Sequence, residues 1–293
     1  MENSAPNTAK EWDIALGKLG VEHARLISMR SWEAAYRDKG MALICGVDEV
    51  GRGCLLGPVY AAAVIMPEDS LIYGVNDSKK ISEAKRKKLN GIILSHAASY
   101  GIGICDNFEI DRLNILEATK LAMRRAIDAL SAKPEAVITD AVRFQSALPS
   151  TEIVKGDEKS YLVACASIIA KVARDAKMAS MANEYPEYDL GSNKGYATKS
   201  HRQAIAKFGP CTAHRFSFIS HFWPEAPLIK EACAFLWGEG YEVKKVTNSE
   251  VIAFSGQTEC IFAYKGLNSI GPYDFYIDKG KLLARKSQSA FAI

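Results

Sequence analysis

Four acidic side chains stand where short apolar runs end or where a helix begins. Asp48 and Glu49 follow one strand-like run, Asp140 ends the run AVITD, and Asp157 precedes a long helical pattern. In open α/β sheets, ligands bind at the carboxyl ends of strands. Mg²⁺ and Mn²⁺ prefer oxygen ligands, and two such ions about 4 Å apart promote phosphodiester hydrolysis. If folding brings the four acids together, their mutual repulsion favours a site for cations.

Each acid also has an ordinary structural interpretation, which the residues alone leave open. Asp48 and Glu49 are compatible with solvated acids beside a glycine-rich turn. Asp157 is compatible with an N-cap of the helix that follows it, because an aspartate side chain readily accepts hydrogen bonds from the first backbone amides of a helix.

The stretch over 44–66 predicts two strands joined by a glycine-rich loop. The loop carries Gly51, Arg52 and Gly53 directly after the first acidic pair. Glycines let the backbone approach a ligand closely, and exposed backbone amides bind anions. The pairing of such a loop with two carboxylates favours a site for metal ions and a phosphate.

The composition is that of a globular protein. Of the 293 residues, 48% are apolar and 24% are charged, which indicates one large domain plus a smaller one. The sequence has no apolar run near the ~20 residues of a membrane span, and its start lacks the apolar part of a secretory signal. Seven cysteines without a CxxC pair favour reduced core thiols. We therefore expect a cytoplasmic protein without membrane contact, whose net charge of +3 permits a nucleic-acid partner.

The patterns divide the chain into an N-terminal helical extension over 1–40, a main domain over 41–224 and a small α+β domain of unknown role over 225–293. Periodicity and turn residues predict the elements in order: a helix over 21–39, two strands within 44–66, a helix after Ser82, a strand over 100–105, a helix over 109–132, a strand over 136–140, a helix over 158–183, a short helix ending near 208, a helix over 226–237 and five short strands. The N-terminal helix is expected to pack on the main domain.

Positive charges gather after the first predicted hairpin. Lys79 and Lys80 precede Ser82, and the run KRKK occupies the first two turns of the helix that Ser82 begins. Cations at a helix start oppose the helix dipole, so local stability does not explain them. A bound polyanion beside the acids would explain them, and a solvated charged face is the alternative.

Six segments, taken in order, resemble ribonuclease HII. They are DEVGRG at 48–53, DSKK at 77–80, the TD acid at 139–140, KGDEKS followed by ASIIAKVARD, KGYATKSH at 194–201 and HRFSF at 214–218. The resemblance covers roughly residues 43–222. It implies a ribonuclease H-like α/β fold, in which the catalytic domain over 41–224 is a five-stranded mixed sheet flanked by helices.

The resemblance further implies a metal-dependent endoribonuclease. Its metal ligands would be Asp48, Glu49, Asp140 and Asp157, which would hold two Mg²⁺ or Mn²⁺ ions. Its partners would be RNA/DNA hybrids and DNA duplexes that contain ribonucleotides. Cleavage would fall on the 5′ side of the ribonucleotide and leave 3′-hydroxyl and 5′-phosphate ends. A monomer is expected, and residues 225–293 are expected to bind nucleic acid or a protein.

The same resemblance assigns the recognition of the substrate. The backbone of Gly51, Arg52 and Gly53 would read the 2′-hydroxyl of the ribonucleotide, Tyr196 would stack on the sugar at the RNA–DNA junction, and Lys79 would lie near the scissile phosphate. This assignment is physically reasonable, because the 2′-hydroxyl is the local feature that separates a ribonucleotide from its deoxy neighbours.

Two other functions are compatible with the acids. A junction resolvase or integrase would share the carboxylates without a reader of the 2′-hydroxyl, and a binding module would use the fold without catalysis. The chain also departs from the family, since Cys54 and Leu56 stand where proline and alanine are common. His201 is interpreted as a phosphate contact or a structural residue, and His214 and Arg215 as residues that fix the end of the domain.

Overall fold

The computed structural model describes residues 9–140, 142, 147–247, 249–264, 267, 273–279 and 281–286. The chain forms two compact units. The first unit comprises Met1–Gly51, Val59–Cys105 and Thr119–Arg174, and the second comprises Arg52–Pro58, Asp106–Ala118 and Asp175–Ile293. Each unit has its own apolar core. The domain boundaries expected near residues 40 and 224 stay predictions.

The first unit contains a five-stranded mixed sheet, as the sequence predicted. Its strands are β1 (Ile44–Val50), β2 (Val59–Ile65), β3 (Ser99–Cys105), β4 (Ala136–Asp140) and β5 (Ser150–Ile153), in the order β3-β2-β1-β4-β5. The pairs β1–β2 and β2–β3 are antiparallel, whereas β1–β4 and β4–β5 are parallel. Parallel pairing brings the carboxyl ends of β1 and β4 to the same edge of the sheet.

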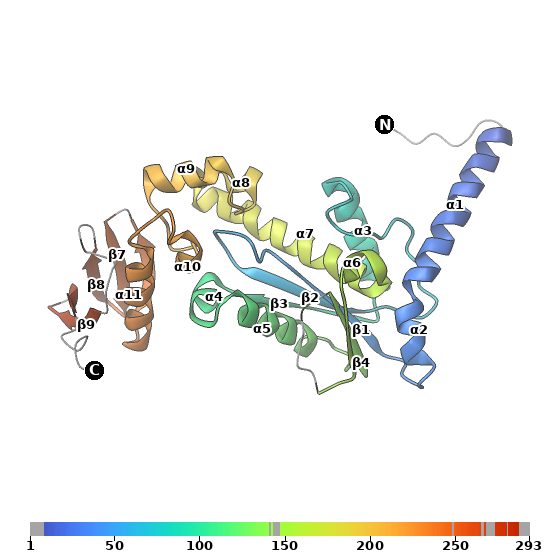
Figure 1. The fold of residues 1–293 in the computed structure, drawn as a ribbon, viewed down its shortest axis with the longest axis horizontal. Coiled ribbons are helices and arrows are strands. Elements are labelled where there is room, and N and C mark those ends of the chain that lie inside the picture. The colour runs from blue at the N-terminus through green and yellow to red at the C-terminus, as the bar shows by residue number, and fades with distance from the viewer. Residues whose placement is uncertain are drawn as a thin grey trace. The chain divides into compact units, whose positions relative to one another are not determined.

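Two long helices lie close to the two faces of this sheet (Figure 1). On one face, α7 (Tyr161–Glu184) runs so near β1 that a Cβ at Gly46 would lie 2.4 Å from the backbone of Leu162. On the other face, α5 (Ile115–Asp128) approaches β3, where a Cβ at Gly103 would lie 1.9 Å from the carbonyl oxygen of Ala122. The sequence provides these close approaches by placing glycine under each helix.

Further helices belong to the first unit. They are α1 (Ala9–Met29), α2 (Ser31–Arg37), α3 (Glu83–His96) and α6 (Gly156–Lys159). The Ser82 side chain accepts from the Lys85 amide and caps α3, as predicted. The N-terminal helices pack on the sheet, because the Tyr36 hydroxyl lies 2.7 Å from Thr151 Oγ1 and Leu26 is fully buried.

The structure corrects three predicted elements. The helix expected over 109–132 is broken at Asn114, whose φ of +72° separates α4 (Asn107–Leu113) from α5. The helix expected over 158–183 is broken at Ser160, between α6 and α7. The strand β5 had no counterpart in the prediction, because its residues alternate between exposed and half-buried positions and form no apolar run.

The second unit carries short helices and a second sheet, as the predicted α+β appendage required. Besides α4, its helices are η1 (Pro186–Tyr188), α8 (Leu190–Asn193), α9 (Lys199–Phe208), α10 (Phe216–Ile219) and α11 (Ala226–Gly238). Its strands are β6 (Glu242–Val246), β7 (Glu250–Ser255), β8 (Thr258–Ala263), β9 (Tyr273–Asp278) and β10 (Lys281–Lys286), in the order β6-β7-β8-β10-β9.

All seven cysteines are free and buried, in agreement with the prediction of core thiols. Among the described helices, none has the combined length and apolar character of a membrane span.

Candidate active site

Asp48 and Asp140 lie side by side at the ends of two neighbouring strands. In the parallel β1–β4 pair, Val47 is the register partner of Thr139. The next residues, Asp48 and Asp140, therefore stand about 4.8 Å apart across the sheet, the usual spacing of paired strands, and share one face. The same face carries Gly46 and is covered by α7.

Asp157 joins this pair through the turn of α6. The Gly156 amide donates to Asp140 Oδ1 at 2.8 Å. A Cβ on Gly156 would lie 3.2 Å from the Cα of Asp140, so this turn packs directly on the end of β4. Asp157 follows immediately and is 4% exposed. The interpretation of Asp157 as a helix cap is wrong, because Ser160 accepts from the Val163 amide where α7 begins.

The pKa shifts of two of these acids reflect their charged neighbours. Burial raises the pKa of Asp48 well above its usual range, and the charges of Glu49, Asp140 and Asp157 raise it further, while a hydrogen bond from Ser167 opposes them. Burial also raises the pKa of Asp157, although Lys79 lowers it. Carboxylates that repel one another in a buried place destabilise the fold unless a cation compensates them.

Glu49 occupies a different position from the other three acids. Successive side chains of a strand point to opposite faces, so the pleat of β1 directs Glu49 away from the face that Asp48 shares with α7. Its register partner is Ala61 on β2. Glu49 is nevertheless near enough to raise the pKa of Asp48. Its expected part in metal binding stays a prediction.

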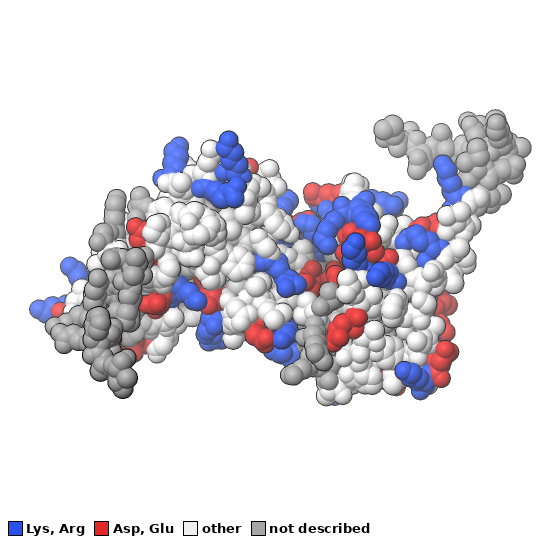
Figure 2. Space-filling view, in the orientation of Figure 1, with Lys and Arg blue, Asp and Glu red and all other residues white. Residues whose placement is uncertain are grey.

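Lys79 reaches the acids from the segment before α3. Its ammonium group lies 3.2 Å from Asp157 Oδ2 and 4.0 Å from Asp77 Oδ1. Partial burial lowers its pKa, but the charges of Asp157, Asp77 and Asp48 outweigh burial and raise the pKa overall. Lys79 is therefore a permanent cation at the site. Figure 2 shows further Lys and Arg side chains gathered over α3 and α6, with acidic side chains among them.

The donor set fits a hard divalent cation. Asp48, Asp140 and Asp157 offer carboxylate oxygens on one face, the ligand type that Mg²⁺ and Mn²⁺ require. With the present side-chain positions, no three His, Cys, Asp or Glu side chains in the described part of the chain meet closely enough to enclose an ion. The ammonium of Lys79 instead holds Asp157. Asp48, Asp140 and Asp157 could therefore share an ion only if their side chains moved closer together, and their part in metal binding stays a prediction.

Gly51 begins the loop after β1, and only glycine fits there. Its φ is +93°, and a Cβ would lie 2.2 Å from Nε of the buried Arg174. Residues other than glycine rarely adopt this backbone conformation. Ser167 and Arg174 lie on α7, within the segment ASIIAKVARD that carries part of the resemblance. No role was predicted for either residue, although Ser167 hydrogen-bonds Asp48 and Arg174 lies against Gly51.

The remaining predicted recognition residues belong to the second unit. Arg52 and Gly53 are exposed, and a Cβ on Gly53 would meet open space. Cys54 forms an antiparallel backbone bridge with Tyr196. The Tyr196 side chain is 39% exposed, so its ring is accessible for stacking. Cys54 and Leu56, the departures from the family pattern, are both fully buried.

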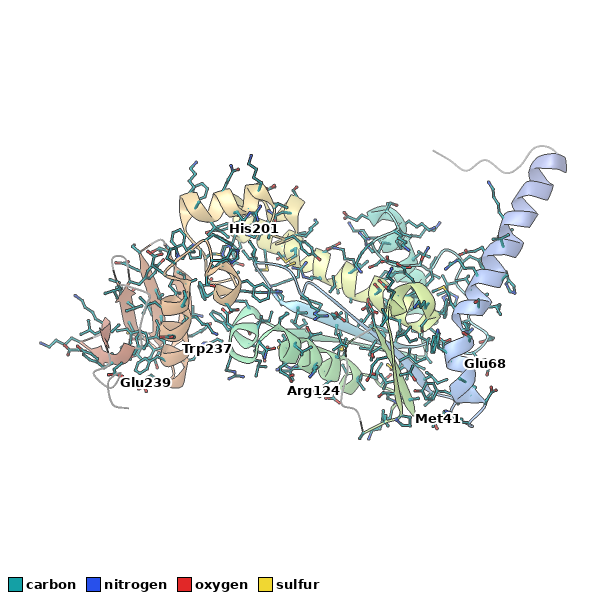
Figure 3. The ribbon with its side chains drawn as sticks, viewed as in Figure 1. Met41, Glu68, Arg124, His201, Trp237 and Glu239 are labelled. Carbon is teal, nitrogen blue, oxygen red and sulfur yellow. The ribbon has the colours of Figure 1, made fainter. Side chains whose placement is uncertain are left out.

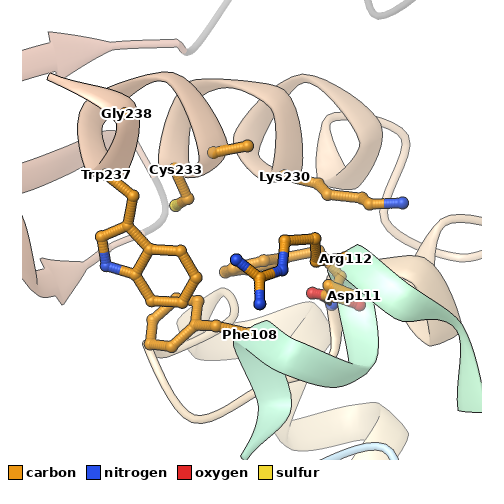
Figure 4. Close-up of a pocket in the computed structure, with 9 residues that line it drawn as sticks. Phe108, Asp111, Arg112, Lys230, Cys233, Trp237 and Gly238 are labelled. Atoms are coloured by element: carbon orange, nitrogen blue, oxygen red, sulfur yellow. Dashed lines mark hydrogen bonds between the residues drawn. The ribbon is translucent and has the colours of Figure 1, made fainter. Parts of the chain in front are cut away.

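A separate pocket of about 290 Å³ lies in the second unit (Figure 4). Phe108 on α4 and Trp237 on α11 line it with their rings 4.4 Å apart, in an edge-to-face arrangement. Asp111 at its wall accepts hydrogen bonds from the amides of Phe216 and Ser217. None of the residues predicted to act on the substrate lines this pocket.

Comparison with known proteins gives consistent similarities. A family model described as Ribonuclease HII matches residues 45–221. Ribonuclease HII of Lactobacillus delbrueckii subsp. bulgaricus is 48% identical over 201 residues, which are 69% of this chain and 78% of that protein. Ribonuclease HII of Bacillus thuringiensis is 48% identical over 197 residues, which are 67% and 77%.

Among solved structures, the ribonuclease H2 from Pyrococcus horikoshii OT3 is similar with a TM-score of 0.52 and 25% identity, over 64% of this chain and 97% of that chain. This likeness confirms the predicted ribonuclease H-like fold. The segment matched by the family model contains every residue predicted to bind the metal ions or the ribonucleotide, but not residues 225–293.

Proposed function

The chain belongs to the ribonuclease HII family, and from this premise we propose that it cleaves the phosphodiester on the 5′ side of ribonucleotides. It is an endoribonuclease H, whose family implies activity on RNA/DNA hybrids. The finer proposal adds single ribonucleotides embedded in DNA duplexes as substrates, with 3′-hydroxyl and 5′-phosphate ends as products.

The observation that carries this proposal is the shared face of three carboxylates. Asp48 lies two residues before the end of β1, Asp140 ends the adjacent parallel strand β4, and the turn that carries Asp157 packs against β4. Their role would be to bind and orient Mg²⁺ or Mn²⁺, with Glu49 as a further ligand. When bound, such ions lower the pKa of water and neutralise charge on the leaving oxygen. The raised pKa of Asp48 supports this role, since a cation would relieve the repulsion.

The loop after β1 is proposed to recognise the ribose. Arg52 lies four residues after Asp48, so the two Cα atoms are at most about 14 Å apart along an extended chain. The backbone of Gly51, Arg52 and Gly53 would then meet the sugar of a ribonucleotide whose phosphate lies at the acids. Tyr196, bridged to the same loop through Cys54, would pack on the neighbouring deoxyribose.

Lys79 and its surroundings are proposed to hold the substrate phosphates. The Lys79 side chain is 75% exposed while its ammonium meets Asp157. It can therefore contact a phosphate that approaches the acids. The exposed lysines at the start of α3 would contact the duplex backbone, a sequence-independent interaction that salt weakens.

We also propose a cytoplasmic location, which the free state of all seven cysteines supports. A monomeric state and a binding role for residues 225–293 stay predictions.

A duplex with one ribonucleotide tests the proposal. In Mg²⁺, the purified chain should nick it once on the 5′ side of the ribonucleotide and leave the matched all-DNA duplex intact. End mapping should give a 3′-hydroxyl and a 5′-phosphate. The absence of a nick in the ribonucleotide-containing duplex would favour a resolvase-like or integrase-like enzyme, and binding without any Mg²⁺-dependent cleavage would favour a binding module. Either result would contradict the proposed function.

Variants of Tyr196 test the recognition of the junction. Tyr196→Ala removes the exposed ring, whereas Tyr196→Phe keeps it and serves as the matched control. Stacking contributes about 1–3 kcal/mol, so the alanine variant should lose roughly 5- to 150-fold in cleavage at a single ribonucleotide. Its affinity for duplex DNA should change much less. Equal losses in cleavage and affinity would count against Tyr196 as a junction reader.

A further inference from the structure

The Arg52–Pro58 loop is bridged to two other segments of the second unit. Cys54 forms an antiparallel bridge with Tyr196, and Leu56 forms one with His214. Groups that fix the segments around Tyr196 and His214 therefore also restrain the backbone of the loop.

Arg215 fixes the loop at both of its ends. This side chain is fully buried, and its guanidinium donates to the carbonyl oxygens of Arg52 and Gly57, each at 2.8 Å. The Arg215 amide donates to the Leu55 carbonyl at 2.8 Å. A single residue thus holds the first, middle and late parts of the loop. A planar guanidinium can meet two carbonyls at once, which an ammonium group cannot match.

Two buried histidines connect Tyr196 to the segment before Arg215. His201 on α9 (Figure 3) is fully buried, and its Nδ1 lies 3.0 Å from the Tyr196 carbonyl oxygen. Its Nε2 lies 3.2 Å from Nε2 of His214, which is also fully buried. The Cys211 amide donates to Nδ1 of His214 at 2.9 Å.

These contacts determine the protonation of both rings. A carbonyl oxygen only accepts, so Nδ1 of His201 carries the hydrogen, and its Nε2 is an acceptor in the neutral ring. An amide only donates, so Nδ1 of His214 is bare and its Nε2 carries the hydrogen. His214 therefore donates to His201, and His201 donates to Tyr196. Each nitrogen has a suitable partner, and Cys211 Sγ lies 3.2 Å from Nδ1 of His214 as well. Burial lowers the pKa of both histidines and so favours the neutral rings.

We propose that His201, His214 and Arg215 are positioning residues for ribonucleotide recognition, which hold the Tyr196 backbone and the Arg52–Pro58 loop in fixed register. The inference rests on the proposed function, because it assumes that the loop reads the 2′-hydroxyl and that Tyr196 packs on the sugar. It also replaces the expected phosphate contact of His201, since a fully buried ring cannot meet a phosphate. These three residues touch no substrate and act through the loop and Tyr196.

The relative position of the loop and Tyr196 matters most when the substrate contains a single ribonucleotide. One embedded ribonucleotide offers a single 2′-hydroxyl, so the loop and the Tyr196 ring must match one sugar step. A uniform RNA/DNA hybrid offers a 2′-hydroxyl at every step of one strand and tolerates a displaced reader better. Loss of register should therefore reduce the ratio of single-ribonucleotide cleavage to hybrid cleavage. A purely structural role would lower both activities together.

His201 offers a matched pair of variants. In His201→Asn, the side-chain amide occupies the place of Nδ1 and can donate to the Tyr196 carbonyl. In His201→Gln, the amide extends to the place of Nε2 and meets His214 instead. We expect the glutamine variant to reduce the cleavage ratio on the order of tenfold and the asparagine variant to keep it within about threefold. Thermal unfolding of both variants shows whether stability follows the same order.

Arg215→Lys provides an independent variant, because a lysine reaches only one of the two carbonyls. It should reduce the cleavage ratio on the order of tenfold. Arg202→Lys, at an exposed position of α9, is the control and should leave the ratio unchanged. An altered ratio at an unchanged melting temperature would support the inference.

The outcomes separate the two levels of the proposal. If the wild-type chain cleaves both substrates, and the His201→Gln and Arg215→Lys variants keep its ratio or lose both activities in proportion to stability, the positioning role is overturned alone. If the wild-type chain does not cleave the single-ribonucleotide duplex, the proposed function is overturned, and this inference falls with it.

Discussion

Asp48→Asn is expected to abolish cleavage and to stabilise the metal-free protein. Asp48 is 4% exposed and lies beside three other carboxylates, which together with burial raise its pKa. Asparagine keeps the shape of the side chain and an acceptor for the Ser167 hydroxyl, but it removes the charge and a metal ligand. Function and stability are therefore expected to change in opposite directions.

The size of the gain follows from the strand spacing. Two unit charges about 5 Å apart at an effective dielectric constant of about 20 repel by roughly 3 kcal/mol. Because the raised pKa opposes ionisation of Asp48, the gain in unfolding free energy should stay below this repulsion, at about 1–2 kcal/mol. For a domain of this size, this corresponds to a rise of about 2–8 °C in melting temperature.

The pH dependence of stability gives the sign of this change in unfolding free energy independently. The folded pKa of Asp48 lies above its unfolded value of about 3.9. The folded state therefore binds this proton more tightly, and the stability that it contributes is lost as pH rises through the folded pKa. The wild-type protein in EDTA should lose this contribution with rising pH, and the Asp48→Asn variant should not show that loss.

The assay is denaturant unfolding in EDTA over a pH series, together with cleavage of the single-ribonucleotide duplex in Mg²⁺. Asp69→Asn, an exposed aspartate away from the three acids, is the control and should change neither quantity. An Asp48→Asn protein that is less stable than the wild type would refute the reasoning about repulsion. Wild-type cleavage by a pure preparation would refute its role as a ligand.

Two further predictions concern the neighbours of the acids. Lys79→Ala removes the cation beside Asp157 and the proposed phosphate contact, so the cleavage rate should fall on the order of tenfold. The acidic limb of the pH–rate profile should move to higher pH, because the pKa of Asp157 rises when Lys79 no longer lowers it. Lys80→Ala is the control, and an equal effect of both variants in pH–rate profiles would contradict the assignment. Gly46→Ala should destabilise the protein by about 3 kcal/mol or more, because the added Cβ meets the α7 backbone at 2.4 Å. Gly91→Ala, in open space on α3, should instead stabilise it by up to about 1 kcal/mol in the same unfolding measurement.

The sequence predicted the parts of the fold that repeat a local pattern. The strands β1, β2 and β4 are apolar runs bounded by turn residues, and their bounds were close to the predicted ones. The placement of Asp140 at the end of β4 followed from these runs, whereas Asp48 was expected after the first strand and lies within β1, two residues before its end. The break at Asn114 was missed because the apolar periodicity continues across it, and a positive φ at an asparagine has no strong pattern of its own.

Long-range contacts at the site were not predictable in the same way. The pairing of Lys79 with Asp157 joins residues 78 positions apart and depends on how α3 and α6 pack. The burial of His201 was also missed, since α9 is mostly polar and its partner His214 comes from a separate turn. The orientation of Glu49 could have been inferred, because two adjacent residues of one strand point to opposite faces.

The most direct test of the account is the position of bound Mn²⁺ in a crystal of the wild-type chain, located by anomalous scattering. The account predicts at least one Mn²⁺ with ligands from Asp48, Asp140 and Asp157, and loss of that ion in the Asp48→Asn protein. Mn²⁺ bound elsewhere, with the Asp140 and Asp157 carboxylates turned away from Asp48, would contradict it.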